Sequence, residues 1–259
     1  MILYYENSKG AKVNLLNHPY RAFKADVFDS SWNKSNDGYK KTIDIDVFGK
    51  ADLYENLNKL YSVLAVDADN DIDGKLWVND TYIKCHVVES KKDKWKSGVV
   101  CTVSITFLAQ SLSWIKEEVK AFYPYGGNSE TGFDYNFDFP IDYSSPDQGN
   151  VEMNIDATAP MDFTMVVYGA SINPFITVNG YPYSVYTTLE AGEYMIIDSK
   201  TQSITKVYLN GEKENIFNDR DTSQSIFKKI DSGNNVVRWD GTFGFDIILY
   251  NSRKEPIWM

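Results

Sequence analysis

The stretch KKTIDIDVFGKADLYENLNKLYSVLA, residues 40–65, combines two periodicities that together decide the fold class. In residues 40–49 apolar and polar side chains alternate, which is the pattern of a half-buried strand. In residues 51–65 leucines recur at helical spacing and place one apolar stripe on one helix face; they are Leu53, Leu57, Leu60 and Leu64. The stretch therefore predicts a strand followed by an amphipathic helix, whose stripe packs on a core.

Strand-like segments fill much of the remaining sequence. They are rich in Val, Ile, Thr, Phe and Tyr, and turn-forming sequences such as DIDG (71–74), NGEK (210–213) and WDGTFG (239–244) separate them. The protein is therefore predicted to be mainly β with one helix. The further predicted strands are TYIKCHVVES (81–90), GVVCTVSITFLA (98–109), MDFTMVVYG (161–169), EYMIIDS (193–199) and FDIILYN (245–251).

Composition narrows the classes of function. The 259 residues are 43% apolar, enough for a real core, and the net charge of −10 argues against a broad or sequence-specific nucleic-acid surface. No run of eighteen apolar residues is present, so we expect no membrane partner, and the start MILYYENSKG does not have the pattern of a signal peptide. The two cysteines, Cys85 and Cys101, are expected to be buried free thiols.

The chain is long enough for two domains. Its composition shifts over residues 124–150, a segment rich in Pro, Gly and aromatic–acid pairs. We place the boundary near residue 128, which gives an N-terminal domain over 1–128 and a C-terminal domain over 129–259.

The stretch DNDIDGKLWVND, residues 69–80, resembles an EF-hand calcium loop. Asp69, Asp71 and Asp73 take the first, third and fifth places, Gly74 the sixth and Asp80 the twelfth. An EF-hand also needs a second helix, but the residues that follow predict a strand. We therefore prefer an acidic turn that leads into a strand, with calcium as the alternative, and we predict no other metal site and no cofactor.

Catalytic motifs are missing from the sequence. A nucleophilic triad usually needs a histidine base, and only His18 and His86 are present. Asp44 and Asp46 share one face of a predicted strand and could suit glycoside hydrolysis, but a solvated strand face is the preferred interpretation. We therefore predict no catalytic residues and no enzymatic activity.

Aromatic side chains offer a possible interaction surface. In YPYSVY (181–186), Tyr181 and Tyr183 fall on one side of an extended segment. Such rings either stack on sugars or pack within a β-sandwich or at an interface, and the packing interpretation is preferred. The candidate residues are Tyr181, Tyr183, Tyr186, Trp239 and Trp258.

Six segments in the later part of the sequence form a recognisable series. They are SLSWIKEE (111–118), YGASINPFITVNG (168–180), LEAGEYMIIDSKTQSITKV (189–207), NGEKENIFNDR (210–220), IFKKIDSGNNVVRW (226–239) and FGFDIILYNSRKEPIW (243–258). In this order they resemble the distal tail protein (Dit) family of long-tailed phages and prophages. The resemblance covers residues 111–258 and weakens to a general pattern before them.

The resemblance implies an N-terminal β-rich domain with one helix that assembles into a homohexameric ring, and a C-terminal galectin-like β-sandwich outside it. The ring would be a structural hub of the virion tail tip, assembled in the cytoplasm of the bacterial host. Its partners would be the tail tube protein on one side and a tail-associated lysin, fibre or receptor-binding protein on the other. The alternative is a carbohydrate-binding, lectin-like β-sandwich that uses the aromatic rings named above.

Overall fold

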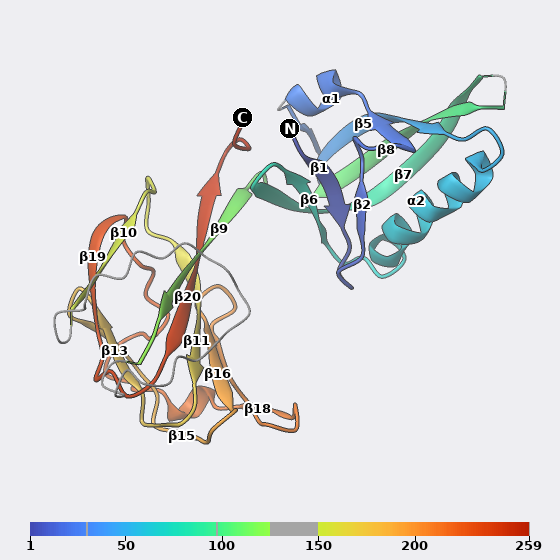
Figure 1. Ribbon diagram of the computed structural model, residues 1–259. Coiled ribbons are helices and arrows are strands. Elements are labelled where there is room, and N and C mark those ends of the chain that lie inside the picture. Colours follow the sequence, from blue (N-terminus) through green and yellow to red (C-terminus); the bar gives the residue numbers. More distant parts are fainter. Residues whose placement is uncertain (30, 97, 125–149, 259) are drawn as a thin grey trace, which may run out of the picture. The chain divides into compact units, whose positions relative to one another are not determined.

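The computed structural model describes residues 1–29, 31–96, 98–124 and 150–258, and it divides into two compact units (Figure 1). The first unit contains Met1–Lys116 and Ser252–Met259, and the second contains Glu117–Asn251. The boundary predicted near residue 128 lies outside the described residues. The chain thus passes through the second unit and returns to the first, whereas the sequence predicts one domain over 129–259.

The first unit is a bent set of antiparallel strands with a long helix against it. Strand order follows β9-β7-β6-β1-β2, and β7 also pairs with β8, which pairs with β5. Short strands β3 and β4 pair with β5. The elements are β1 (Leu3–Glu6), β2 (Lys12–Asn14), β3 (Tyr20–Ala22), α1 (Lys24–Phe28), β4 (Asn33–Ser35), β5 (Gly38–Phe48), α2 (Leu53–Ala68), β6 (Gly74–Val78), β7 (Thr81–Lys96), β8 (Val100–Ala109) and β9 (Trp114–Phe122).

The predicted strand and helix of residues 40–65 are confirmed as β5 and α2. All four leucines of the stripe are buried in the core of this unit, because α2 lays that face against the strands. Gly49 makes the tight entry possible, since a Cβ there would lie 2.5 Å from the Leu53 backbone nitrogen. A second, five-residue helix, α1, was not predicted; at one and a half turns it is too short to show a periodicity.

The end of the chain completes the first unit. The Asn79 side chain donates to the Ile257 carbonyl at 2.7 Å and accepts from the Ile2 backbone N–H at 2.9 Å, so one turn residue holds both termini. The Trp258 ring packs on this core and lies 5.1 Å from the Phe28 ring, centroid to centroid. The C-terminal residues are therefore a structural part of the first unit, whose other residues end at Lys116, more than a hundred residues earlier.

Deleting residues 254–259 is expected to lower the free energy of unfolding by about 2 kcal/mol, because half-buried Trp258 leaves its packing site. Chemical denaturation followed by circular dichroism measures the change. The exposed residue Lys254 supplies the control, since Lys254→Ala should leave the free energy within about 0.5 kcal/mol of the wild type. A truncated chain as stable as the wild type would contradict this role for the C-terminal residues.

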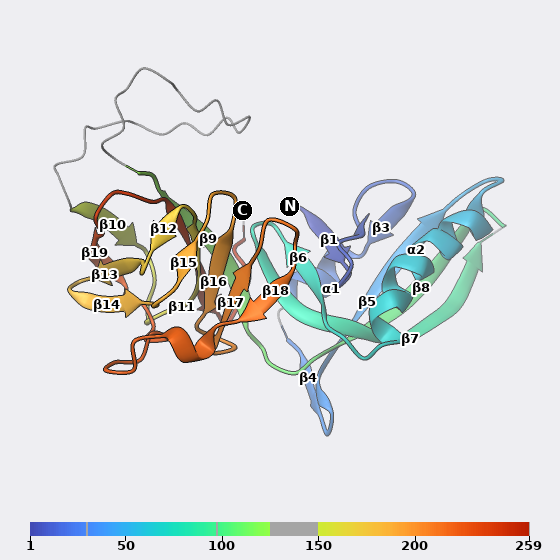
Figure 2. The same cartoon turned by 90° about the horizontal axis from the view of Figure 1, so that it is seen from below.

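The second unit is a β-sandwich (Figures 1 and 2). One sheet has the order β18-β17-β16-β11-β20-β9, the other β10-β19-β13-β14, and β12 pairs with β15. The elements are β10 (Val151–Ile155), β11 (Asp162–Tyr168), β12 (Ser171–Ile172), β13 (Phe175–Val178), β14 (Tyr181–Ser184), β15 (Thr188–Leu189), β16 (Tyr194–Asp198), β17 (Ser203–Val207), β18 (Lys213–Asn215), the 3-10 helix η1 (Phe217–Asp219), β19 (Gly233–Arg238) and β20 (Phe245–Arg253).

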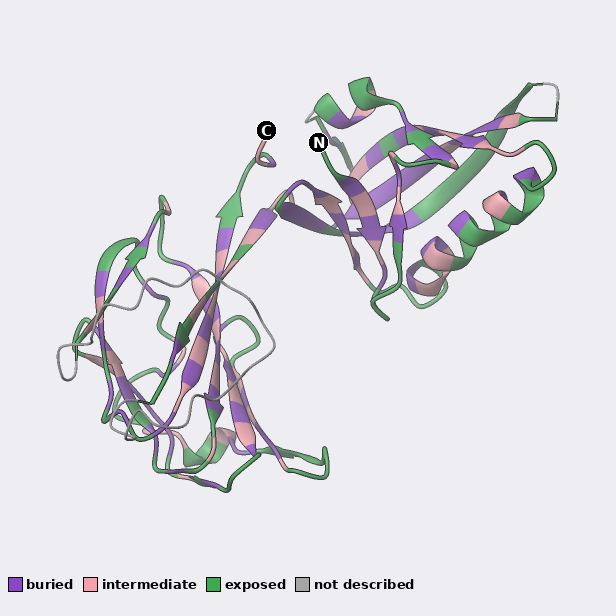
Figure 3. Ribbon diagram, viewed as in Figure 1, coloured by how far each residue is buried: buried purple, intermediate pink, exposed green. Residues whose placement is uncertain are grey.

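Buried and more exposed side chains alternate along these strands, and the buried ones form the core of the second unit (Figure 3). In β11 the buried positions are Phe163, Met165 and Val167, and in β20 Phe245, Ile247 and Leu249 face the same core. The predicted strands over 161–169, 193–199 and 245–251 are confirmed as β11, β16 and β20. The mainly β fold class is confirmed, because strands dominate both units. No helix among the described residues is long and apolar enough to cross a membrane.

Candidate functional site

The acidic stretch 69–80 connects α2 to the hairpin of β6 and β7. The Asp69 backbone N–H donates to the Ala65 carbonyl at 2.9 Å and closes the helix. Asp71 has a φ of 51°, in the left-handed region that aspartate tolerates better than most residues. From Gly74 the chain is extended in β6, so the interpretation as an acidic turn that leads into a strand is confirmed.

The four carboxylates considered for calcium do not surround one point. Asp73 and Asp80 flank β6 at its two ends, about 20 Å apart at the rise of an extended strand. Asp71 and Asp73 contact the two ring nitrogens of His86 instead, at 3.4 and 2.9 Å. Across the ranges that the structure describes, no group of three or more His, Cys, Asp or Glu side chains is placed to hold a metal ion. This stretch therefore lacks the geometry of a twelve-residue calcium loop.

A buried hydrogen-bond network occupies the inner side of this junction. The Tyr5 hydroxyl donates to the fully buried Asp67 carboxylate at 2.5 Å, and the Ser8 backbone N–H donates to its other oxygen at 2.9 Å. Burial first, and then the hydrogen bond to Asp67, raise the pKa of Tyr5. Gly74 lies directly against this pair, since a Cβ there would be 2.4 Å from the Tyr5 hydroxyl. The glycine of the apparent calcium motif is thus explained by packing.

The five candidate aromatic residues do not form one surface. Tyr183 and Trp239 are core residues of the second unit. The Tyr183 hydroxyl donates to the Lys228 carbonyl at 2.8 Å, and the Trp239 indole N–H donates to the Phe243 carbonyl at 3.0 Å. Neither ring is therefore available to stack on a sugar in the folded unit, which corrects their inclusion among candidate surface residues.

The other three candidates lie in different settings. Tyr181 is half-buried, and the Lys228 ammonium lies 4.1 Å from the centre of its ring, so that ring face is already covered. Tyr186 is 59% exposed. Trp258 belongs to the first unit, where it packs on the core. Of the five, Tyr186 alone presents most of its ring to solvent.

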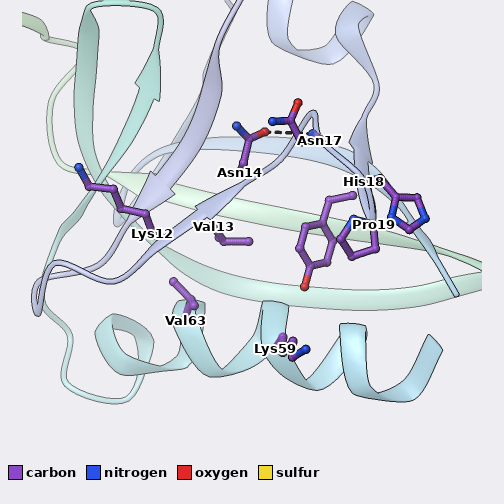
Figure 4. Close-up of a pocket in the computed structure, with 9 residues that line it drawn as sticks. Lys12, Val13, Asn14, Asn17, His18, Pro19, Lys59 and Val63 are labelled. Atoms are coloured by element: carbon purple, nitrogen blue, oxygen red, sulfur yellow. Dashed lines mark hydrogen bonds between the residues drawn. The ribbon is translucent and has the colours of Figure 1, made fainter. Parts of the chain in front are cut away.

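A pocket lies between β2, the turn after it and α2 (Figure 4). Its volume is about 260 Å³. Two ammonium groups line it, but Lys59 pairs with Glu55 at 2.8 Å and Lys12 with Glu6 at 3.7 Å. Amide and ammonium groups of this kind can hold a small anion, yet the cations already have partners. The lining residues are Lys12, Val13, Asn14, Asn17, His18, Pro19, Tyr20, Lys59 and Val63.

Groups considered for catalysis take structural roles. The Ser104 hydroxyl donates to Asp44 and the Thr102 hydroxyl to Asp46, each at 2.6 Å across the β5–β8 pair. The thiols of Cys85 and Cys101 are free and buried, as predicted, and burial raises the pKa of both. Carboxylates that belong to cross-strand pairs stabilise the sheet.

A surface that was not predicted from the sequence lies along one side of α2 and at the end of the β7–β8 hairpin. Tyr54 is 72% exposed, Tyr61 is 56% exposed and Trp95 is 47% exposed. Tyr54 and Tyr61 are seven residues apart, so they lie on one side of the helix, at the border of the leucine stripe. The signal in the sequence is two large rings beside the apolar stripe of a predicted helix. Exposed aromatic rings of this kind are typical of interaction surfaces.

The chain is similar to solved structures of phage tail proteins over 98% of its length. Its TM-score with the Dit protein of phage SPP1, described as a paradigm of the hub adsorption apparatus, is 0.51 at 11% identity, and 88% of that chain is covered. A chain of the phage P2 baseplate in its activated conformation with Ca gives 0.59 at 11% identity and 100% coverage. A chain of the phage p2 baseplate with Sr gives 0.61 at 11% identity and 99% coverage.

This protein has a Dit-like phage tail hub fold. The likeness includes both units, since nearly the whole chain and nearly the whole of the compared chains are matched. No family model matches the sequence, and no curated protein does. The Dit-like fold is therefore retained at a sequence identity of 11%, where the pattern of strands and turns persists and most side chains differ.

Proposed function

We propose that this protein is a non-enzymatic structural component of a phage or prophage tail tip. The observation that carries the proposal is the likeness to baseplate and hub proteins from end to end, with both units included. The first unit supports a role in assembly, because it carries exposed aromatic rings on α2 and on the β7–β8 hairpin.

In this proposal six copies form a closed ring through their first units, and the β-sandwich units lie outside. The ring connects the tail tube to the tail-associated lysin, fibre or receptor-binding proteins, and it is part of the virion tail tip after assembly in the host cytoplasm. The burial of Tyr183 and Trp239 speaks against the lectin-like alternative, because it removes two of the rings that such a module could use.

Native mass spectrometry of the full chain over a range of protein concentrations tests the proposal. We expect a six-fold species that grows with concentration, and negative-stain images of closed rings. A chain that remains monomeric at the highest concentration and binds sugars on a glycan array would contradict the hub and favour the lectin-like module.

A further inference from the structure

The β7–β8 hairpin carries a basic segment on a strongly acidic protein. Residues 91–96 read KKDKWK, with four lysines against one aspartate, a net charge of +3 in a chain whose net charge is −10. Every residue described from Val88 to Lys96 is exposed (Figure 3). This half of β7 therefore contributes little to the core, and the side chains of Lys92, Lys94 and Lys96 are presented to solvent.

One side of this basic strand is an open sheet edge. β7 pairs with β6 over Thr81–Cys85 and with β9 at Tyr82 and Ile83, but among the described strands it pairs beyond Cys85 only with β8. Trp95 gives the edge an apolar centre, and its ring lies 6.0 Å from the ring of Tyr54 on α2. Trp95 is 47% exposed at this end of the hairpin, and large exposed aromatic rings are enriched at protein interfaces.

The opposite end of α2 carries the complementary charge. The hairpin end lies at the start of α2, where the Gly49 backbone N–H donates to the Val99 carbonyl at 2.9 Å. Sixteen residues place the other end of the helix about 24 Å away (Figure 1). There the segment DNDID, residues 69–73, has a net charge of −3, and Asp71 is 91% exposed.

The helix adds to the negative potential at that end. The C-terminus of a helix carries a partial negative charge, and the last turn of α2 contains no basic residue. Ile72, 49% exposed, lies among the aspartates and offers an apolar contact. The first unit therefore presents a basic surface with an exposed tryptophan at one end and an acidic surface with an exposed isoleucine at the other.

We propose that the basic hairpin of one copy docks on the acidic end of α2 of the next copy. The inference rests on the proposed ring and specifies its contact. Two different, complementary surfaces at opposite ends of one unit produce a heterologous contact, which is the type that closes into a ring. The contact surfaces are Lys92, Lys94, Trp95 and Lys96 on one copy, and Asp69, Asp71 and Ile72 on its neighbour.

Two charge-reversal variants test the contact. The hairpin variant carries Lys92→Glu, Lys94→Glu and Lys96→Glu. The helix-end variant carries Asp69→Lys and Asn70→Lys, which keeps Asp71 at its positive φ and in contact with His86. All five side chains are exposed, so both variants are expected to fold, and circular dichroism and thermal melting verify this.

The hairpin variant places like charges across the contact, and the helix-end variant raises the net charge of residues 69–73 from −3 to 0. Native mass spectrometry should therefore show at least a ten-fold loss of the ring in each variant. When the two variants alternate in an equimolar mixture, half of the contacts place the introduced lysines opposite the introduced glutamates, and the other half join two wild-type surfaces. Alternation closes only in a ring with an even number of copies, so the mixture should give a hexamer with three copies of each variant.

The results of these experiments distinguish a failure of the proposed contact from a failure of the proposed ring. A wild-type chain that forms no ring overturns the proposed function and this inference together. A wild-type ring that persists in both variants, or a mixture that does not restore it, overturns the contact alone. The lysines would then serve to keep the open β7 edge from pairing with other chains.

A neutral variant covers the case in which reversal prevents folding. Lys92→Gln, Lys94→Gln and Lys96→Gln together remove the charge without repulsion, and they should shift ring formation to higher protein concentration. In the wild type about 1 M salt should produce a similar shift, because the screening length falls to about 3 Å. A neutral variant that forms the ring at the wild-type concentration would overturn the contact.

Discussion

Replacing Gly74 by alanine should destabilise the first unit by about 3 kcal/mol or more. The added Cβ would lie 2.3 Å from the Asp67 Oδ2 atom, 2.4 Å from the Tyr5 hydroxyl oxygen and 2.6 Å from the Glu6 carbonyl oxygen. The Glu6 oxygen is backbone in β1, and Tyr5 and Asp67 are fully buried, so none of the three atoms can move cheaply.

The hydrogen-bond network increases the cost. To admit the methyl group, the Tyr5 hydroxyl must leave the Asp67 carboxylate, which would then be buried with one partner fewer. A buried carboxylate that loses a hydrogen bond is penalised by its desolvation. The steric overpacking and the lost Tyr5–Asp67 hydrogen bond affect the same side chains, so their free-energy costs are coupled. Together they exceed the cost of an ordinary glycine-to-alanine change.

Differential scanning calorimetry measures the effect as a fall of about 10 °C in the melting temperature of the first unit. Gly10→Ala is the matched control in the same unit. Nothing lies within 4 Å of a Cβ there, but its φ is +82°, so the control isolates backbone strain of about 1 kcal/mol. Equal losses of stability in the two variants would show that the close contacts around Gly74 add no cost of their own, which would contradict this prediction.

The local pattern of the sequence was sufficient for the main elements. Alternation predicted β5, β11 and β20, and the leucine stripe predicted α2, because burial on one face imposes these periods. The acidic turn before β6 was also predictable, since the residues after it alternate as a strand and not as a helix. These features depend on neighbours in sequence.

Features that depend on distant residues could not be predicted in this way. The return of the last residues to the first unit depends on Asn79, whose side chain reaches residue 257. The role of Gly74 depends on Tyr5, which is 69 residues away in sequence, and on Asp67 in the helix before it. The same sequence pattern is compatible with a calcium loop and with a glycine that packs against a tyrosine. Only the residues that surround Gly74 in space distinguish the two.

The aromatic residues show the same limit. Tyr181 and Tyr183 were correctly placed on one side of an extended segment, and their rings do meet, 5.5 Å apart. Which side faces the core depends on the second sheet, and for Tyr183 the deciding contact is the buried Phe163 on β11. Conversely, Tyr54 and Trp95 are brought together by the fold, so the sequence alone does not predict the surface that they share.

Replacing Phe245 by alanine should cost the second unit about 3–5 kcal/mol, the usual range for a fully buried phenylalanine. Phe245 is the centre of an aromatic cluster. Its ring stacks on Phe122 with centroids 4.6 Å apart and meets Trp239 edge to face at 5.2 Å. Such pairs contribute about 0.5–1.5 kcal/mol each beyond the area that they bury, so we expect a value near the upper end of the range.

The variant also tests whether the two units are stabilised separately. Because each unit has its own core, the melting transition of the second unit should fall by about 10 °C or more while that of the first unit stays in place. Phe175→Ala is the control, because Phe175 lies in the same unit and is 52% exposed, so its removal should change little. A joint fall of both transitions would show that β9 and β20, which pass from one unit to the other, couple the two cores. If the ring belongs to the first unit, Phe245→Ala should still form it below the lowered transition, which native mass spectrometry can verify.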